Sequence, residues 1–224
     1  MLRQVIQKKL KSSGKNYFVD KDIPDSLIAL TLYKRIIMMI RGILKIRKVI
    51  FLGRHVRIYN KSNFSVGANC TIENSVVIDC YAKEKITFGD SVKIGANSII
   101  SVTSHLSKYG IGLKIGNHSS IGEYSYIGSS GGIEIGNDVI MGQFISFHSE
   151  NHYFSDKNKL IREQGVYSQG IKLGNNIWVG AKVTFLDGCA VSDNSIVASG
   201  AVVKGSFPPN VIIGGVPAKI IKEI

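Results

Sequence analysis

Cysteine is scarce in this sequence, and its three residues follow neither a pairing pattern nor a metal-binding pattern. Cys70, Cys80 and Cys189 are odd in number, and none of them stands in a C-x-x-C arrangement. A disulfide framework and a thiolate zinc site are therefore not indicated, and we expect no metal. Sparse, unpaired cysteine suits a reducing compartment, so we expect a cytoplasmic protein.

Long apolar runs are also missing. The N-terminus leads into a polar, Lys-rich stretch, so no secretory signal is visible. The segment from Leu27 to about Ile46 is apolar at most positions, but Lys34, Arg35 and Arg41 interrupt it. Its uncharged runs stay far below the roughly 18 residues expected of a membrane span. We interpret this segment as one amphipathic helix that begins near Pro24-Asp25-Ser26.

Acidic residues are rare in the N-terminal segment, residues 1–50, where twelve Lys or Arg oppose three Asp and give +9 of the overall +12. Lys34, Arg41, Lys45 and Lys48 fall on one face of the predicted helix. Such a segment can meet anionic lipid, an anionic glycan or nucleic acid. The aromatic-basic interleaving typical of single-strand binding is missing, so nucleic acid is not an expected partner. Two alternatives stay open: the helix covers the open end of the following domain, or it makes peripheral contact with the inner membrane surface.

From about Leu52 a fixed period of six residues replaces this pattern. An aliphatic or aromatic residue, usually followed by a small one, opens each unit. These residues are Val66, Ile72, Ile78, Phe88, Ile94, Ile100, Ile115, Ile121, Ile127, Ile135, Met141, Phe147, Leu173, Val179, Phe185, Val191, Val197 and Val203. A small residue tends to recur four places later, as Cys70, Ser98, Ser119, Ser125, Cys189, Ser195 and Ala201 show. We expect both sets to face a tight interior.

The interruptions of the period indicate how the units are arranged. Extra residues follow Ile78, Ile100, Ile127 and Phe147, each of which closes a group of three units. Three short strands would form one triangular coil, and stacked coils would form a solenoid. All extra loops then leave from one corner of the triangle, which points to that corner as a functional edge.

Six-residue units of this kind resemble the hexapeptide-repeat acyltransferases, over roughly Leu52 to Ile224. The resemblance implies coils that wind left-handed and subunits that form homotrimers. We therefore expect a mainly β fold, a left-handed parallel β-helix with an N-terminal helical extension. The predicted parts are a basic extension over 1–50, the β-helix over 51–208 with a long loop over 148–172, and a C-terminal coenzyme A-binding tail over 209–224.

Two stretches, His148–Asp156 and Ile171–Gly180, are similar to the branch that contains galactoside, maltose and streptogramin acetyltransferases and the O-acetyltransferases of bacterial surface polysaccharides. In that branch an Asn-His pair opens the long loop, and its His is the general base. The match in this sequence is Asn151-His152, with His148 as the alternative base. A neutral imidazole must take the proton of a hydroxyl that attacks a thioester, which typically contributes about 10²–10⁴-fold. The resemblance also makes the backbone N–H of Ala181 the oxyanion donor.

The tail carries a Gly-Val-Pro-Ala-Lys segment that resembles the coenzyme A end of these enzymes. Acetyl-coenzyme A is accordingly the expected co-substrate, held in the groove between two prisms. Lys219 and Lys222 are expected on a short terminal helix, where they would reach the nucleotide phosphates. The contacts that the resemblance implies are Trp178, Gly180, Ala181, Ser199, Lys204, Pro217, Lys219 and Lys222.

The expected reaction is transfer of acetyl from acetyl-coenzyme A to a sugar hydroxyl of a surface polysaccharide, such as capsule or O-antigen, or of its precursor. Asn151, His148, Tyr124 and Ser125 are candidate acceptor contacts. A small acceptor, such as an antibiotic, a free sugar, serine or an amino sugar, is the alternative within acyl transfer. Two other classes are a metal site like that of γ-type carbonic anhydrases, built from His118, His148 and His152, and a non-catalytic glycan-binding scaffold.

Overall fold

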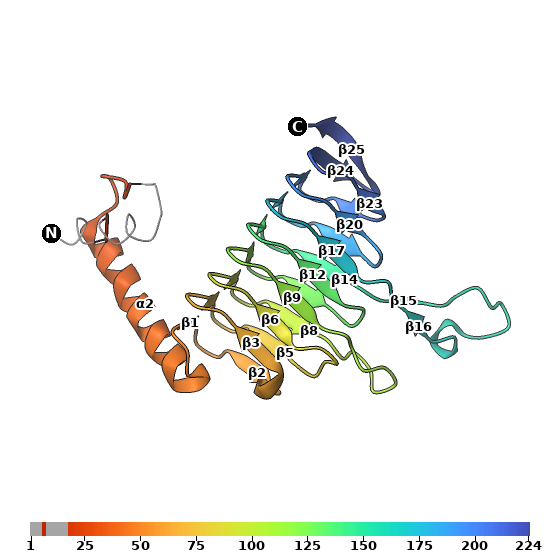
Figure 1. The fold of residues 1–224 in the computed structure, drawn as a ribbon, viewed down its shortest axis with the longest axis horizontal. Coiled ribbons are helices and arrows are strands. Elements are labelled where there is room, and N and C mark those ends of the chain that lie inside the picture. Colours follow the sequence, from red (N-terminus) through yellow and green to blue (C-terminus); the bar gives the residue numbers. More distant parts are fainter. Residues whose placement is uncertain (1–5, 8–17) are drawn as a thin grey trace. The chain divides into compact units, whose positions relative to one another are not determined.

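The computed structural model describes residues 6–7 and 18–224 of the chain. The chain divides into two compact units, Met1–Phe51 and Leu52–Ile224. The first unit contains the helix α2 (Asp25–Ile46), and the second contains the stacked strands (Figure 1).

Helix α2 begins and ends as its sequence predicts. It starts directly after Pro24 and carries Asp25 in its first turn, where a negative charge suits the helix dipole. Its C-cap is Arg47, whose φ of 60° places it in the left-handed region and whose N–H donates to the Ile43 carbonyl at 3.0 Å. Within the described part of the chain, none of the helices has the length and apolarity that crossing a membrane requires.

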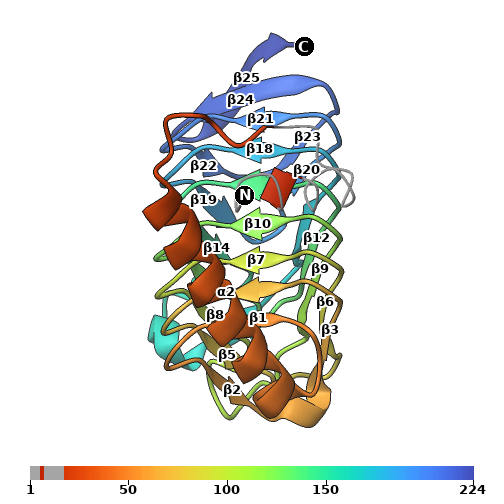
Figure 2. The ribbon, with the colours of Figure 1, turned by 90° about the vertical axis from the view of Figure 1, so that its left-hand side faces the viewer.

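The second unit is a triangular prism with one sheet on each side, and the strands are parallel except for the last one, which pairs antiparallel. Sheet A consists of β1 (Phe51–Leu52), β4 (Thr71–Ile72), β7 (Lys93–Ile94), β10 (Ser120–Ile121), β13 (Ile140–Met141), β18 (Trp178–Val179), β21 (Ile196–Val197), β24 (Val211–Gly215) and β25 (Ala218–Glu223). Sheet B consists of β2 (Arg57–Tyr59), β5 (Val77–Asp79), β8 (Ile99–Ser101), β11 (Tyr126–Gly128), β14 (Ser146–His148), β19 (Thr184–Leu186) and β22 (Val202–Val203). Sheet C consists of β3 (Phe64–Val66), β6 (Ile86–Phe88), β9 (Leu113–Ile115), β12 (Ile133–Ile135), β17 (Ile171–Leu173), β20 (Ala190–Val191) and β23 (Ser206–Phe207). The chain passes from sheet C to A to B in each coil, and the coils wind left-handed (Figure 2).

The core consists of the two residue sets that the six-residue period selects. All eighteen large residues that open a unit are buried, and neighbouring coils stack them in register, as in Ile94 beside Ile121 and Phe147 beside Phe185. The small residues four places later are buried as well, with Ser98 and Ala201 at 0% exposure. The predicted β-helix and its interior are confirmed, because apolar residues at every sixth position leave no other common face to bury.

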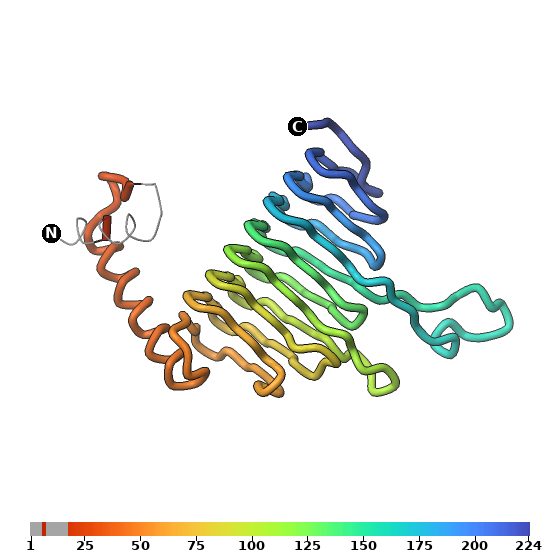
Figure 3. Tube along the Cα trace, viewed as in Figure 1, coloured from red at the N-terminus to blue at the C-terminus, as the bar shows by residue number. Residues whose placement is uncertain are grey.

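The corner between sheets B and C, which we call corner BC, carries all the long connections, as the interruptions of the period predict. A loop joins β8 to β9 there, and a longer one joins β14 to β17. Both leave the stack on the side opposite sheet A (Figure 3). The longer loop contains the short strands β15 (Asn151–His152) and β16 (Val166–Tyr167) and a 3-10 turn over Ile161–Glu163.

The C-terminal tail differs from the prediction, because Lys219 and Lys222 lie on a strand rather than on a short terminal helix. Strand β24 continues sheet A by pairing in parallel with β21, and β25 returns antiparallel to β24. Gly215, with φ of 97°, lies where the chain reverses. A helix of so few residues would leave most of its end groups without partners, whereas the hairpin satisfies the backbone of both strands.

Candidate active site

His152 lies at the base of the long loop, in the two-residue strand β15. Asn151 pairs with Tyr167 and His152 pairs with Val166 in an antiparallel ladder. The side chain of His152 is exposed, and no described residue hydrogen-bonds to its imidazole. The backbone pairing therefore fixes the position of the His152 Cα atom, while both nitrogens of its imidazole stay accessible to a substrate.

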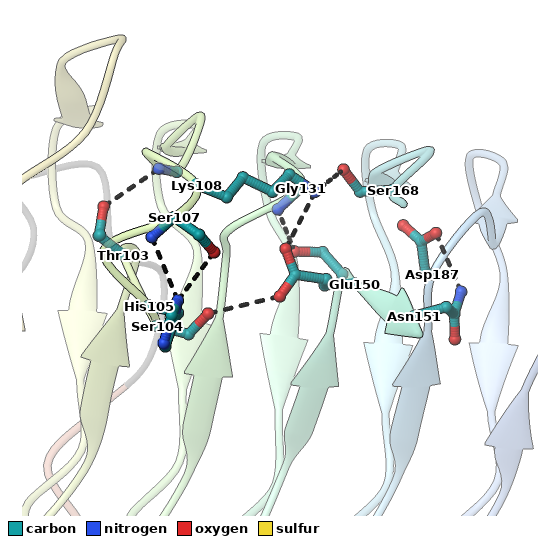
Figure 4. Close-up of polar contacts among 12 residues, drawn as sticks. Thr103, Ser104, His105, Ser107, Lys108, Gly131, Glu150, Asn151, Ser168 and Asp187 are labelled. Carbon is teal, nitrogen blue, oxygen red and sulfur yellow. Dashed lines mark hydrogen bonds and ion pairs between the residues drawn. The ribbon is translucent and has the colours of Figure 1, made fainter. Parts of the chain in front are cut away.

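The neighbouring Asn151 is held by the next coil. Its amide donates from Nδ2 to Asp187 Oδ2 at 3.1 Å, and Asp187 also accepts the backbone N–H groups of Gln169 and Gly170 at 2.8–2.9 Å (Figure 4). Asn151 thus uses its amide inside the protein. This contact explains why an Asn precedes the His at the start of the loop.

His148, the alternative base, has a different environment. It ends strand β14, and its Nε2 lies 2.7 Å from the Ser146 hydroxyl, while its ring centroid lies 6.0 Å from that of Tyr126. His55 and His118 occupy exposed turn positions with positive φ. One ring nitrogen of His148 is thus already engaged, unlike either nitrogen of His152.

The corner between sheets A and B, which we call corner AB, presents a row of backbone donors. Within this corner the N–H groups of Gln143, Ala181 and Ser199 have no acceptor in the described structure. The carbonyl groups of Gln143 and Ala181, in contrast, do have hydrogen-bond partners. Lys182 N donates to the Gln143 carbonyl and Gly200 N donates to the Ala181 carbonyl, each at 2.9 Å. Adjacent coils are about 4.8 Å apart, so these N–H groups form a fixed line of open donors along the prism axis.

The corner between sheets C and A shows that an open N–H is not a general property of these turns. There each coil supplies an Asn or Asp whose side-chain oxygen accepts the equivalent N–H of the coil before it. The acceptors are Asp90, Asn117, Asn137, Asn175 and Asp193, at 2.7–2.9 Å from the donor nitrogens. At corner AB the first turn follows the same rule, since Asn74 Oδ1 accepts the Arg54 N–H at 2.7 Å. The later turns have Ala96, Glu123, Gln143, Ala181 and Ser199 at the matching position, and none of these side chains accepts the N–H of the coil before it. This difference is readable in the sequence but was not part of the prediction.

The predicted coenzyme A contacts fall on four parts of the prism. Gly180, Ala181 and Ser199 gather at corner AB, where a Cβ added to Gly180 would lie 2.4 Å from Ser199 Oγ, so the glycine permits close stacking. Trp178 projects outward from sheet A with 56% of its surface exposed, so it is not a core residue. The C-terminal hairpin carries Pro217, Lys219 and Lys222, all exposed, whereas Lys204 lies at corner BC, away from this group.

The candidate acceptor residues are separated in the same way. Tyr124 is exposed at corner AB and stacks on Phe144, with ring centroids 5.4 Å apart. Ser125 is buried, and its hydroxyl donates to the Gly122 carbonyl and accepts from Ile145 N. Because this hydroxyl is used inside the coil, we leave Ser125 out of the proposed acceptor pocket.

His152 and the row of open N–H donors lie at different corners of the prism. His152 projects from corner BC, whereas Ala181 lies at corner AB, so one chain does not bring the imidazole to the open N–H groups.

Stacked six-residue coils with a long loop at one corner define this protein as a left-handed parallel β-helix protein of the hexapeptide-repeat class.

Curated proteins with similar sequences are acetyltransferases by name. The chain is 29% identical over 163 residues to the proposed lipopolysaccharide biosynthesis O-acetyl transferase WbbJ of Escherichia coli K12, covering 69% of this chain and 80% of WbbJ. It is 30% identical over 132 residues to the galactoside O-acetyltransferase of the same organism, covering 58% of this chain and 63% of that enzyme, which is less than two thirds of its length. No family model matches the chain.

Solved structures share the fold. A galactoside acetyltransferase in complex with coenzyme A superposes with a TM-score of 0.52 at 23% identity, covering 96% of this chain and 90% of the other. A variant of AntD, an N-acyltransferase from Bacillus cereus in complex with dTDP and coenzyme A, gives 0.58 at 22% identity, covering 71% and 83%. These likenesses show that the chain shares the β-helix fold of these acyltransferases, and its sequence is similar to that of O-acetyltransferases.

Proposed function

We propose that this protein is an O-acetyltransferase that moves the acetyl group of acetyl-coenzyme A to a sugar hydroxyl. The observation that carries the proposal is the row of open N–H donors at corner AB. An extended chain of amides, such as the pantetheine arm of coenzyme A, has acceptors that suit such a row. The curated names of the similar proteins, which are O-acetyl transferases, support the same chemistry.

In the proposed reaction, the neutral imidazole of His152 removes the proton from the acceptor hydroxyl as its oxygen bonds to the thioester carbonyl. The carbonyl oxygen becomes negative at that moment. The N–H of Ala181 donates to this oxygen, and its position is fixed because the Ala181 carbonyl is bonded to Gly200 of the next coil. Breakage of the carbon–sulfur bond then releases the thiolate of coenzyme A, which takes the proton from the imidazolium and leaves as the free thiol.

We propose further that the site forms between two copies of the chain in a trimer. One copy would supply His152 from corner BC, and its neighbour would supply Ala181 and Ser199 from corner AB. This division accounts for the separation of the two groups within one chain. Sedimentation equilibrium should give a trimer, and an active monomer would contradict the arrangement.

The proposed acceptor is a surface polysaccharide or its lipid-linked precursor. Helix α2 supports this choice, because Leu30, Tyr33, Ile40 and Leu44 are exposed on it beside the cations of the basic face. An exposed apolar row bordered by cations suits peripheral contact with anionic lipid, which would bring the enzyme to a membrane-held acceptor. Vesicle co-sedimentation with and without anionic lipid tests this contact, and equal binding to both vesicles would refute its electrostatic part.

The function is tested by acetyl transfer onto a panel of acceptors: lipid-linked and polymeric glycans, free sugars, amino sugars and a streptogramin. We expect turnover with the glycans, and robust turnover of the antibiotic alone would overturn the choice of acceptor. His152→Ala should abolish transfer while coenzyme A still binds. His118→Asn is the matched control, since His118 is an exposed turn residue with φ of 58° that Asn tolerates. If His152→Ala retains transfer and His148→Ala does not, His148 is the base.

A further inference from the structure

The long loop joins the prism through a narrow pair of segments, which we call the neck: Ser149–His152 where the chain leaves and Val166–Gly170 where it returns. The antiparallel ladder between them contains just the pairs Asn151–Tyr167 and His152–Val166. An isolated two-stranded ribbon is marginal in water even when it is longer than this. Something outside the ladder must therefore hold the neck.

The loop that leaves corner BC two coils earlier contributes a cation to the neck. Lys108, from the loop between β8 and β9, places its Nζ 3.0 Å from Glu150 Oε2 and donates to the Ser168 hydroxyl, also at 3.0 Å (Figure 4). Glu150 belongs to the outgoing segment and Ser168 to the returning one. The side chains of Lys108 and Glu150 are 29% and 19% exposed, so solvent screens this pair less than a surface pair.

The following coil contributes an anion. Asp187, just after β19, accepts the Asn151 amide from the outgoing segment and the N–H groups of Gln169 and Gly170 from the returning one. Gly188 N donates to the Gly170 carbonyl at 2.8 Å and adds a backbone bond on the same side. Both segments of the neck are therefore tied to the following coil through Asp187 and to the earlier β8–β9 loop through Lys108.

Gly131 shows how closely the neck fits against the prism. A Cβ at this position would lie 1.8 Å from the Ser149 carbonyl oxygen and 2.5 Å from Ser168 Cβ. Its N–H donates to the Ser149 hydroxyl at 2.9 Å, which fixes the outgoing segment at its first residue. The neck therefore leaves no room for a shift toward the prism.

We propose that Lys108 and Asp187 are positioning residues that clamp the neck from opposite sides and so set the place of the His152 imidazole. His152 directly follows Glu150 and Asn151, the two residues whose side chains the clamp holds. Loss of either partner frees one edge of the ladder. The consequence for catalysis rests on the proposed function, because it assumes that His152 is the base.

The activity test uses Lys108→Met, which keeps the aliphatic length and removes the charge. We expect kcat to fall about 10–100-fold, since a displacement of about 1 Å of a reacting group can cost about 10² in rate. The KM for acetyl-coenzyme A should stay within about twofold, because Lys108 lies away from corner AB. Lys108→Arg should recover most of kcat, since a guanidinium can bridge Glu150 and Ser168.

Lys114→Met is the matched control. Lys114 pairs with Glu84 at 2.7 Å on the exposed face of sheet C, away from the neck, so its loss removes the same charge without touching the loop. This variant should keep wild-type kcat. Equal losses in Lys108→Met and Lys114→Met would assign the effect to net charge and refute the clamp.

A second measurement does not depend on activity. Amide hydrogen exchange of the substrate-free protein should speed up at Gln169, Gly170 and the ladder residues in Lys108→Met and in Asp187→Ala, while the prism strands keep their protection. Unchanged exchange in both variants would refute the clamp. Faster exchange with no change in kcat would keep the clamp but refute His152 as the base, so failure of the clamp and failure of the proposed function can be told apart.

Discussion

Removal of a single N–H group, by Ala181→Pro, tests the donor row at corner AB. Ala181 has negative φ and precedes Lys182, whose φ is 60°, and a turn with positive φ at its second position favours Pro at its first. No described acceptor receives the Ala181 N–H, so the substitution breaks no hydrogen bond of the fold. The free energy of unfolding should therefore change by about 1 kcal/mol or less.

The expected loss of activity follows from the number of donors removed. Loss of one donor to a developing oxyanion typically lowers kcat by about 10²–10³, or about 2.7–4 kcal/mol in activation free energy. Binding of coenzyme A should weaken far less, because Gln143 and Ser199 still present their N–H groups. The assay is acetyl transfer to the best acceptor of the panel, followed by release of the coenzyme A thiol.

Ala181→Gly is the control, because it changes the side chain and keeps the N–H. This variant should retain kcat within a few-fold of the wild type. If Ala181→Pro folds, binds coenzyme A and turns over at the wild-type rate, the N–H of Ala181 does not stabilise the reacting oxygen and the proposed mechanism is wrong.

Two further predictions concern the prism itself. Phe185→Ala should lower the free energy of unfolding by about 3–5 kcal/mol in urea titrations, because the ring is fully buried and stacks on Phe147 with centroids 4.7 Å apart; a loss below about 1 kcal/mol would contradict the stacked core. Burial raises the pKa of Cys80 and of Cys189 from 9.0 to about 12, so the stability they contribute is full below pH 9 and falls as the pH rises from 9 toward 12. The urea midpoint should decrease over that range, less steeply in Cys189→Ala, and an identical decrease in that variant would refute the contribution of Cys189.

The sequence was sufficient for the prism because its information is local and repeated. Each coil needs an apolar residue at every sixth position and a small one four places later, as Ile121 and Ser125 illustrate, and burial of both follows directly. The six-residue period continues on both sides of an insertion such as the one after Phe147. The corner from which each loop leaves could therefore be determined by counting six-residue units.

Contacts between distant loops could not be predicted in this way. The ion pair between Lys108 and Glu150 joins two insertions, and insertions obey no period. The terminal segment was predicted wrongly because the spacing of Lys219 and Lys222, three residues apart, is compatible with a helix as well as with a strand. The antiparallel pairing of β25 with β24 decides in favour of the strand. Pairing with an existing sheet edge overrides so short a helical pattern.

The measurement that tests the central claim most directly is a crystal structure of the protein with acetyl-coenzyme A. The account predicts that the pantetheine arm lies along the N–H groups of Gln143, Ala181 and Ser199, with the His152 imidazole of a neighbouring copy within about 3 Å of the place where the attacking hydroxyl must stand. Acetyl-coenzyme A bound at any other face, or a His152 imidazole directed away from the thioester, would contradict it.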